Sequence, residues 1–128
     1  MSVLLDTHVL LWFQSLDERI SPALRDRIEH SDEDHYVSHV SFWGIAIKTY
    51  IGKLKLDRDL SATFRAIQDA GFLILPLRES HFLGIATLPL HHRDPFDRML
   101  IAQAKHEGMH ILTADAHFGA YDVPVIGV

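Results

Sequence analysis

The stretch DPFDRMLIAQAKHEGMHILTAD, residues 94–115, decides the fold class because it predicts a helix followed at once by a buried strand. Asp94 is a typical helix N-cap, Pro95 suits the first helical position, and Gly108 is the residue type that ends helices. The apolar run that follows predicts a strand ending at Asp115. A helix leading directly into a buried strand is typical of an α/β fold.

The same alternation of helical segments and short apolar runs continues over the rest of the chain. Further strands are expected at SVLLD (2–6), HYVSHV (35–40), FLILPL (72–77) and VPVIGV (123–128). Further helices are expected at about 7–16, from Ser21 and Pro22, from Ser41, around Leu60–Ile67 before Gly71, and at 80–88. The pattern predicts one domain over residues 1–128, with a mostly parallel sheet of four to five strands and helices on both faces.

Composition narrows the possible functions. The 128 residues suit one domain, and 48% hydrophobic residues can supply one core. Cysteine is absent, which excludes disulfides and thiolate metal sites and is consistent with a cytoplasmic protein. A net charge of −5 argues against gripping nucleic acid by bulk positive charge. No apolar run is long enough for a membrane span, and the first residues lack the basic segment of a signal peptide, so no membrane partner is expected.

Aspartates stand where an α/β fold gathers its ligands. Asp6 and Asp115 each follow an apolar strand, and Asp97 lies in the first turn of a helix. The carboxyl ends of parallel strands share one edge of the sheet, so these three side chains can converge. Three carboxylates stay ionised together only beside a cation, and oxygen ligands suit Mg²⁺ or Mn²⁺. Such an ion points to phosphodiester hydrolysis.

A structural interpretation of the same acids stays open. A lone aspartate after a strand often caps a loop or is solvated. Asp94 and Asp97 also have the positions of an N-cap and a first-turn acid, which stabilise a helix through its dipole. The metal site is favoured because acids occur at all three places that the fold would bring to one edge.

Four segments together resemble the PIN-domain proteins, and among them the VapC-like toxins of bacterial toxin–antitoxin pairs. These segments are LLDTHVLLW (4–12), SFWGIAIK (41–48), LPLHHRDPFDRMLIAQA (88–104) and ILTAD (111–115). The resemblance covers essentially the whole chain and implies a PIN-like three-layer α/β domain. It also implies a Mg²⁺- or Mn²⁺-dependent ribonuclease, often dimeric and inhibited by a partner antitoxin.

The resemblance assigns roles to individual residues. Asp6, Asp97 and Asp115 would be catalytic and would bind the metal, with Asp115 holding water or a second ion more often than ligating tightly. Three neighbours would support the site: Asp94, Thr7 and Thr113.

Gly44 is where this chain departs from the family pattern. The family has an acid at this position of its WEIAIK motif. With Ser41 as N-cap, Gly44 would also be the third helical residue, where a capping box favours Glu or Gln. Loss of the acid implies a weakened or inactive enzyme. The alternative is a catalytically impaired module that binds antitoxin or RNA without cleaving. A third, weaker interpretation is a metal-dependent phosphatase or nucleotide-processing enzyme.

Basic and histidine residues are less decisive. Lys48, Arg93 and Arg98 are candidates for contacting the RNA backbone, and a solvated face is the alternative. His91 and His92 lie in a polar loop, which favours solvated side chains over a functional role. A histidine zinc site is disfavoured.

Apolar periodicity predicts how the segment around Gly44 packs. Six residues recur at three and four residues, the spacing of a buried helical face: Phe42 and Ala46, and Trp43, Ile47, Tyr50 and Ile51. Together with the run LLWF (10–13), this segment supplies more apolar surface than one helix face needs. The sequence therefore predicts a homodimer.

Overall fold

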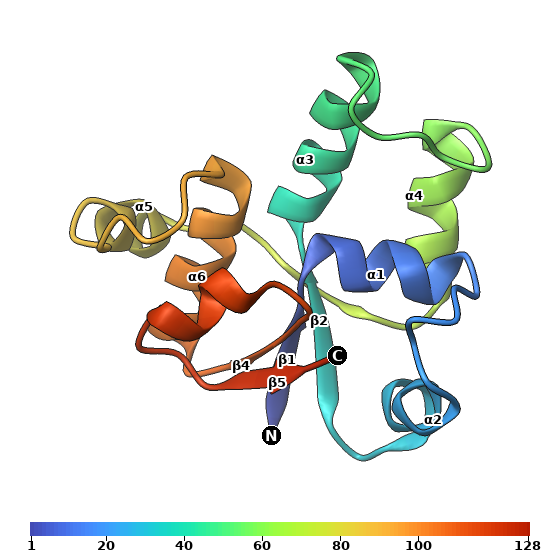
Figure 1. Cartoon of the computed structure of the whole chain (residues 1–128), viewed down its shortest axis with the longest axis horizontal. Coiled ribbons are helices and arrows are strands. Elements are labelled where there is room, and N and C mark those ends of the chain that lie inside the picture. The colour runs from blue at the N-terminus through green and yellow to red at the C-terminus, as the bar shows by residue number, and fades with distance from the viewer.

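The computed structural model describes all 128 residues and contains a five-stranded parallel sheet between helices (Figure 1). Its strands are β1 (Ser2–Leu5), β2 (Asp34–Ser38), β3 (Leu73–Leu75), β4 (His110–Thr113) and β5 (Val125–Gly127). Their order across the sheet is β3-β2-β1-β4-β5, and every neighbouring pair is parallel. The predicted α/β fold with a parallel sheet is confirmed, and β1 and β4, which lead to Asp6 and Asp115, are neighbours.

Helices cover both faces of this sheet. They are α1 (Thr7–Gln14), α2 (Pro22–His30), α3 (His39–Tyr50), α4 (Leu60–Asp69), α5 (Glu79–Ile85) and α6 (Pro95–Glu107), with a short 3₁₀ helix, η1 (Ala116–Ala120). None of these helices combines the length and the apolar character that crossing a lipid bilayer requires.

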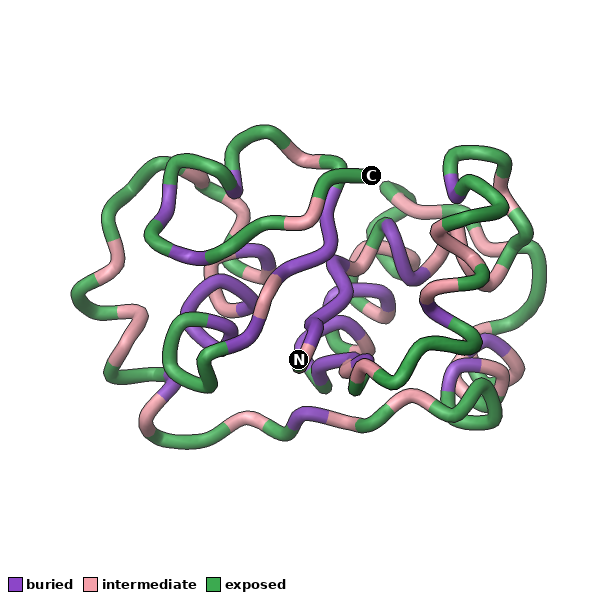
Figure 2. The backbone as a smooth tube through the Cα atoms, turned by 90° about the horizontal axis from the view of Figure 1, so that it is seen from below, coloured by how far each residue is buried: buried purple, intermediate pink, exposed green.

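Two hydrophobic clusters lie on opposite faces of the sheet. Successive residues of a strand point to opposite faces, so β1 contributes Leu4 to one cluster and Leu5 to the other. Leu4 packs in the cluster that contains Leu100 of α6, whereas Leu5 packs in the cluster that contains Ile45 of α3 and Ile67 of α4. Figure 2 shows buried residues along the inner strands and exposed residues along the connecting loops. This arrangement is the predicted three-layer architecture.

Helix α6 begins and ends as its sequence predicts. Asp94 is the N-cap, and one of its carboxylate oxygens accepts the backbone N–H groups of Phe96 and Asp97. Pro95 occupies the first helical position. Gly108 has φ +69°, a left-handed conformation that glycine adopts without steric cost. These signals hold Asp97 in the first turn of the helix, at the end that faces the sheet edge.

The start of α3 differs from the prediction. The expected N-cap was Ser41, but the helix begins at His39, and Ser38 is the N-cap that accepts the N–H of Val40. The hydroxyl of Ser38 donates to Oε1 of Gln103 at 2.6 Å, a contact from α6 that fixes this buried side chain. Consequently Gly44 is the sixth helical residue, and the predicted capping-box position does not apply to it.

The apolar face predicted for α3 is exposed. Trp43, Ile47 and Ile51 are 57%, 41% and 57% exposed, and Tyr50 is 83% exposed. The helical spacing was read correctly, but Gly44 and Ile45 form the buried side instead. The prediction of a buried face is therefore wrong for these four side chains in the single chain, whereas Phe42 and Ala46, the other two residues of that face, are half-buried.

Candidate functional site

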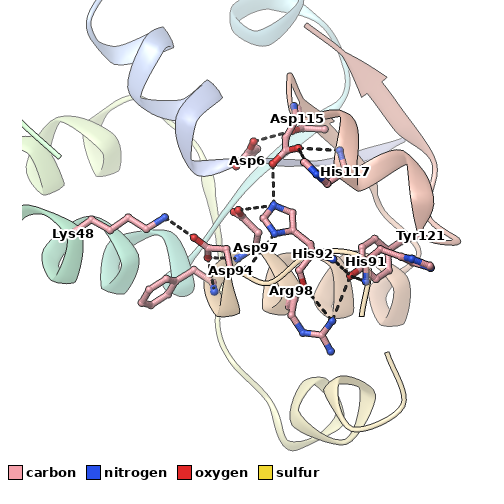
Figure 3. Close-up of polar contacts among 12 residues, drawn as sticks. Asp6, Lys48, His91, His92, Asp94, Asp97, Arg98, Asp115, His117 and Tyr121 are labelled. Carbon is pink, nitrogen blue, oxygen red and sulfur yellow. Dashed lines mark hydrogen bonds and ion pairs between the residues drawn. The ribbon is translucent and has the colours of Figure 1, made fainter. Parts of the chain in front are cut away.

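Three aspartates meet at the carboxyl edge of the sheet (Figure 3). Asp6 directly follows β1 and lies at the N-cap position of α1, whereas Asp115 follows β4 by two residues and is the N-cap of η1. Asp97 reaches the same place from α6. Nε2 of His92 lies 3.2 Å from Oδ2 of Asp97 and 2.9 Å from Oδ2 of Asp115. The structure thus brings together all three acids selected from the sequence.

Asp6 is the most deeply buried of these acids, with 3% of its surface exposed. Its Oδ2 accepts a hydrogen bond of 2.7 Å from the hydroxyl of Thr113, which in turn accepts the N–H of Asp115. Its Oδ1 is buried and has no hydrogen-bond partner in the chain. Burial raises the pKa of Asp6, and Thr113 only partly opposes that shift. An unpartnered buried carboxylate oxygen is costly, and a cation at this point would remove the cost.

Asp97 is also buried, with 8% exposed. Burial is the main cause that raises its pKa from 3.8 to about 7, and the negative charges of Asp6 and Asp94 add to the shift. A carboxyl group with this pKa holds a proton for much of the time at neutral pH. A divalent ion would replace that proton, because it favours the ionised form.

Asp115 lies in the opposite electrostatic situation. Partial burial works to raise its pKa, but hydrogen bonds to the backbone N–H of His117 and to the side chains of His92 and His117 outweigh it. The net result is a lowered pKa. Asp115 is therefore a stable carboxylate in this site, held by donors of the chain itself.

Two supporting residues named from the sequence also contact other elements. The hydroxyl of Thr7 shares a hydrogen bond of 2.8 Å with that of Ser41, which joins α1 to α3 beside Asp6. Besides capping α6, Asp94 accepts a hydrogen bond of 2.9 Å from Nζ of Lys48 on α3. Burial works to raise the pKa of Asp94, yet Lys48 and the backbone N–H of Asp97 lower it overall.

His92 is the site residue that sequence reasoning missed. The prediction of a solvated side chain is wrong, since the ring is only 14% exposed and touches both Asp97 and Asp115. His117 was also missed, and its Nδ1 lies 2.9 Å from Oδ1 of Asp115. The available signal for His92 was its place two residues before the N-cap of α6, in the loop that leads to Asp97.

The loop that carries His92 is held from two sides. The hydroxyl of Tyr121 accepts the backbone N–H groups of His91 and His92 at 2.9 and 2.7 Å. The guanidinium of Arg98 donates to the carbonyl oxygens of Leu88 and Pro89 at 3.1 and 2.9 Å. The loop therefore has a fixed path into α6.

These contacts also bear on the three candidate RNA-binding cations. The guanidinium of Arg98 binds loop carbonyls, and Nζ of Lys48 pairs with Asp94. Arg93 lies between these two residues in the sequence, and its side chain is exposed. Of the three, Arg93 is the side chain that the surrounding chain leaves most accessible.

Gly44 is buried against the ring of Phe96, which lies next to Asp97 on α6. A Cβ built at Gly44 would lie 3.3 Å from Cγ of Phe96, a close contact that requires a small movement of the ring. Trp43 packs edge-on against the same ring, with 5.0 Å between ring centroids. The aromatic ring thus fills the space beside the glycine.

Fold and site together define a class: α/β proteins with a carboxylate-lined candidate metal site at the edge of a parallel sheet. The model of the PIN domain matches residues 3–124. The chain therefore belongs to the PIN-domain family. No curated protein matches its sequence.

Solved structures of similar fold cover nearly the whole chain. VapBC2 from Rickettsia felis, bound to a DNA fragment from its promoter, has a TM-score of 0.76 at 10% identity, covering 99% of this chain and 98% of that one. FitAcB from Neisseria gonorrhoeae has a TM-score of 0.67 at 21% identity, covering 98% and 96%. VapBC-5 from Mycobacterium tuberculosis, of a toxin–antitoxin family, has a TM-score of 0.62 at 21% identity, covering 99% and 98%. At these identities the likeness establishes the fold.

Proposed function

We propose that this chain is a Mg²⁺- or Mn²⁺-dependent endoribonuclease and the toxin of a toxin–antitoxin pair. The observation behind this proposal is that Asp6, Asp97 and Asp115 gather at one edge of the sheet, where the Oδ1 of Asp6 is buried without a hydrogen-bond partner. PIN domains are generally nucleases, which supports hydrolysis of a phosphodiester. We further propose that residues 1–128 act as a single domain in the cytoplasm.

Asp6, Asp97 and Asp115 would hold the ion in this proposal. Their donor atoms are all carboxylate oxygens, which hard divalent cations prefer. Such an ion, when bound, activates water and neutralises charge on the phosphate. The raised pKa values of Asp6 and Asp97 fit a site built for a cation, since both acids are ionised at a cost without one.

The surrounding residues of the chain hold these acids in place. Thr113 fixes one oxygen of Asp6 and the backbone of Asp115 at the same time. Asp94 caps α6 and binds the N–H of Asp97, so the backbone of Asp97 enters the site at a set position. In this proposal Lys48, Arg93 and Arg98 lie near the path of the RNA backbone, with Arg93 the most accessible to it.

Gly44 supports a second candidate function, a PIN module that binds antitoxin or RNA without cleaving. Residue 44 is glycine and supplies no fourth carboxylate, and the ring of Phe96 packs beside it. Three acids can still hold an ion with additional waters, but the ion and its attacking water would be held less firmly. We therefore expect cleavage that is slow for this family.

Two protein partners belong to the proposal. An antitoxin is favoured because the similar structures include VapBC and FitAB complexes. A second copy of this chain is favoured by the exposed apolar side chains of α3, Trp43, Ile47, Tyr50 and Ile51. Light scattering should give a dimer at micromolar concentration, and a strict monomer there would contradict this part of the proposal.

The central experiment is RNA cleavage by the purified chain with Mg²⁺ or Mn²⁺, with EDTA, and with Asp6→Asn. We expect cleavage that needs the ion and is lost in the variant. Asp32→Asn, an exposed acid away from the site, is the matched control and should cleave normally. Cleavage unaffected by Asp6→Asn would overturn the assigned site. Hydrolysis of small phosphate esters without RNA cleavage would favour the phosphatase alternative.

A further inference from the structure

We propose that His92 is a positioning residue: its Nε2–H donates a fixed hydrogen bond to Asp115 beside the carboxylate of Asp97, and so holds Asp97 and Asp115 at the spacing the metal requires. The inference rests on the proposed metal site and adds a residue outside its set of acids. The two carboxylates come from different elements, α6 and the end of β4, and His92 is the side chain that touches both.

The other ring nitrogen fixes the direction of the hydrogen bond to Asp115. Nδ1 of His92 accepts the backbone N–H of Asp94 at 3.1 Å. A nitrogen that accepts a hydrogen bond carries no hydrogen, so the ring hydrogen lies on Nε2. Nε2 therefore donates to Oδ2 of Asp115, with Oδ2 of Asp97 3.2 Å away, and it has no free lone pair for an ion.

This tautomer separates two possible roles of the cluster. His92, Asp115 and His117 place ligand atoms within 4.8 Å of one another, close enough for one ion. Metal binding through Nε2 of His92 would require a hydrogen on Nδ1, which would then face the N–H of Asp94. The hydrogen bond from Asp94 thus disfavours a histidine-ligated ion and favours a donor that orients the carboxylates.

The ring itself is held for this task. Tyr121 binds the backbone N–H of His92 at 2.7 Å. The ring of Phe118, which is fully buried in η1, meets the imidazole edge-on at a centroid distance of 5.7 Å. The imidazole is therefore fixed at the backbone, at Nδ1 and on its side, so Nε2 has one direction in which to donate.

Binding of Mn²⁺ by the full chain tests the role. Residues that orient metal-binding carboxylates typically cost 10–100-fold in metal affinity when removed. We expect His92→Ala to raise the Kd for Mn²⁺, measured by calorimetry, by about that factor. His92→Gln, whose amide N–H can reach the same oxygens, should recover most of the loss. His30→Ala, at an exposed histidine of α2 whose ring pairs only with Asp26, is the matched control and should leave the Kd unchanged.

The tautomer gives a second measurement that does not depend on activity. In ¹⁵N–¹H spectra, the hydrogen of His92 should stay on Nε2 with and without Mg²⁺. Movement of that hydrogen to Nδ1 on adding Mg²⁺ would overturn the proposal and make His92 a ligand. Equal affinity for Mn²⁺ in His92→Ala and the unmodified chain would also overturn it.

Failure of the proposed function remains distinguishable from failure of this inference. If the unmodified chain binds no divalent ion, the metal-dependent function fails. The role of His92 is then decided by the carboxyl ¹³C shifts of Asp97 and Asp115 in the metal-free protein. Both should move in His92→Ala and return in His92→Gln, and shifts that do not move would count against the positioning role.

Discussion

The candidate metal site has two sides, and the pKa of an aspartate is shifted in opposite directions on the two. On the β4 side, Asp115 accepts the backbone N–H of His117 and lies against two imidazoles, and its pKa is lowered. On the α3–α6 side, Asp97 is buried near Asp6 and Asp94, Gly44 offers no side chain, and the pKa of Asp97 rises to about 7. Deep burial and two neighbouring negative charges act on Asp97, whereas hydrogen-bond donors outweigh a shallower burial at Asp115.

This difference indicates which carboxylates a bound cation would stabilise most. Asp115 is already stabilised as a carboxylate by its own chain, so an ion adds little to its ionisation. Asp97 and the unpartnered oxygen of Asp6 lack such donors and gain most from a positive charge. The α3–α6 side is therefore the side on which binding of the metal and stability of the fold are coupled.

The largest expected effect comes from neutralising each side in turn. Asp97→Asn should reduce RNA cleavage by about 100-fold or more, equivalent to about 3 kcal/mol of barrier, because an ion loses a ligand. The same change should stabilise the metal-free protein, since it removes a buried group that ionises at a cost. Chemical denaturation in EDTA measures that stability.

Asp115→Asn is the paired variant and should behave in the reverse way. It should reduce cleavage less and should destabilise the metal-free protein, because its donors lose an ionised acceptor. Equal changes in the stability of Asp97→Asn and Asp115→Asn would contradict the proposed difference between the two sides of the site.

The second prediction concerns the pH dependence of the metal-free protein. A raised carboxyl pKa means that the folded state holds a proton that the unfolded state has released between about pH 4 and 7. The contribution of Asp97 to the free energy of unfolding is therefore greatest below pH 4 and falls, by on the order of 4 kcal/mol, as pH rises towards about 7. Asp6, whose pKa is also raised, acts in the same direction.

A matched comparison isolates Asp97 in that experiment. Burial lowers the pKa of His35, which makes stability rise with pH just below the ordinary histidine pKa and partly masks the slope. The difference between the unmodified chain and Asp97→Asn removes this contribution. A difference that stays constant from pH 4 to 7, measured by urea denaturation in EDTA, would show that Asp97 ionises normally.

The third prediction adds the missing charge to the α3–α6 side. Gly44→Glu should tighten Mg²⁺ binding by about tenfold, about 1.4 kcal/mol, and should lower the stability of the metal-free protein through repulsion with the nearby acids. The ring of Phe96 must move slightly, since Cβ would lie 3.3 Å from its Cγ. Gly44→Gln has the same shape without the charge and is the control. If calorimetry gives the same Mg²⁺ affinity for both variants, the charge is not what this position lacks.

Local sequence signals were sufficient for part of this picture. The Asp94–Pro95 start and the Gly108 end of α6 are determined within a few residues, so its bounds could be read directly. The meeting of Asp6 and Asp115 required only that apolar strands be parallel and adjacent. Both inferences depend on neighbours in sequence or on the general geometry of a parallel sheet.

The errors arose where distant residues decide. Ser38 and Ser41 are both good N-caps, and the choice between them depends on Gln103, 65 residues away. His92 looked solvated because its partner Asp115 is 23 residues away. Periodicity likewise located the apolar residues of α3 without showing that no part of this chain covers them.

The smallest expected effect concerns Tyr121, whose hydroxyl holds the backbone of the loop that carries His92. Tyr121→Phe keeps the ring that packs in the core but removes the acceptor for the N–H groups of His91 and His92. The two unpartnered donors should cost about 1–2 kcal/mol of stability, seen as a thermal midpoint lowered by several degrees. Tyr36→Phe, which also keeps a ring packed against the core but whose hydroxyl makes no hydrogen bond in the chain, is the matched control and should leave the midpoint nearly unchanged.

Metal affinity shows whether that support also sets the site. In Tyr121→Phe the imidazole of His92 keeps its contacts with the N–H of Asp94 and the ring of Phe118. We therefore expect the Kd for Mn²⁺ to rise less than in His92→Ala. A loss as large as that of His92→Ala would mean that the loop backbone, rather than the imidazole donor, holds Asp97 and Asp115 together. An unchanged Kd together with a lowered midpoint would mean that Tyr121 only stabilises the fold. The orientation of the His92 imidazole would then depend on its contacts with the N–H of Asp94 and the ring of Phe118.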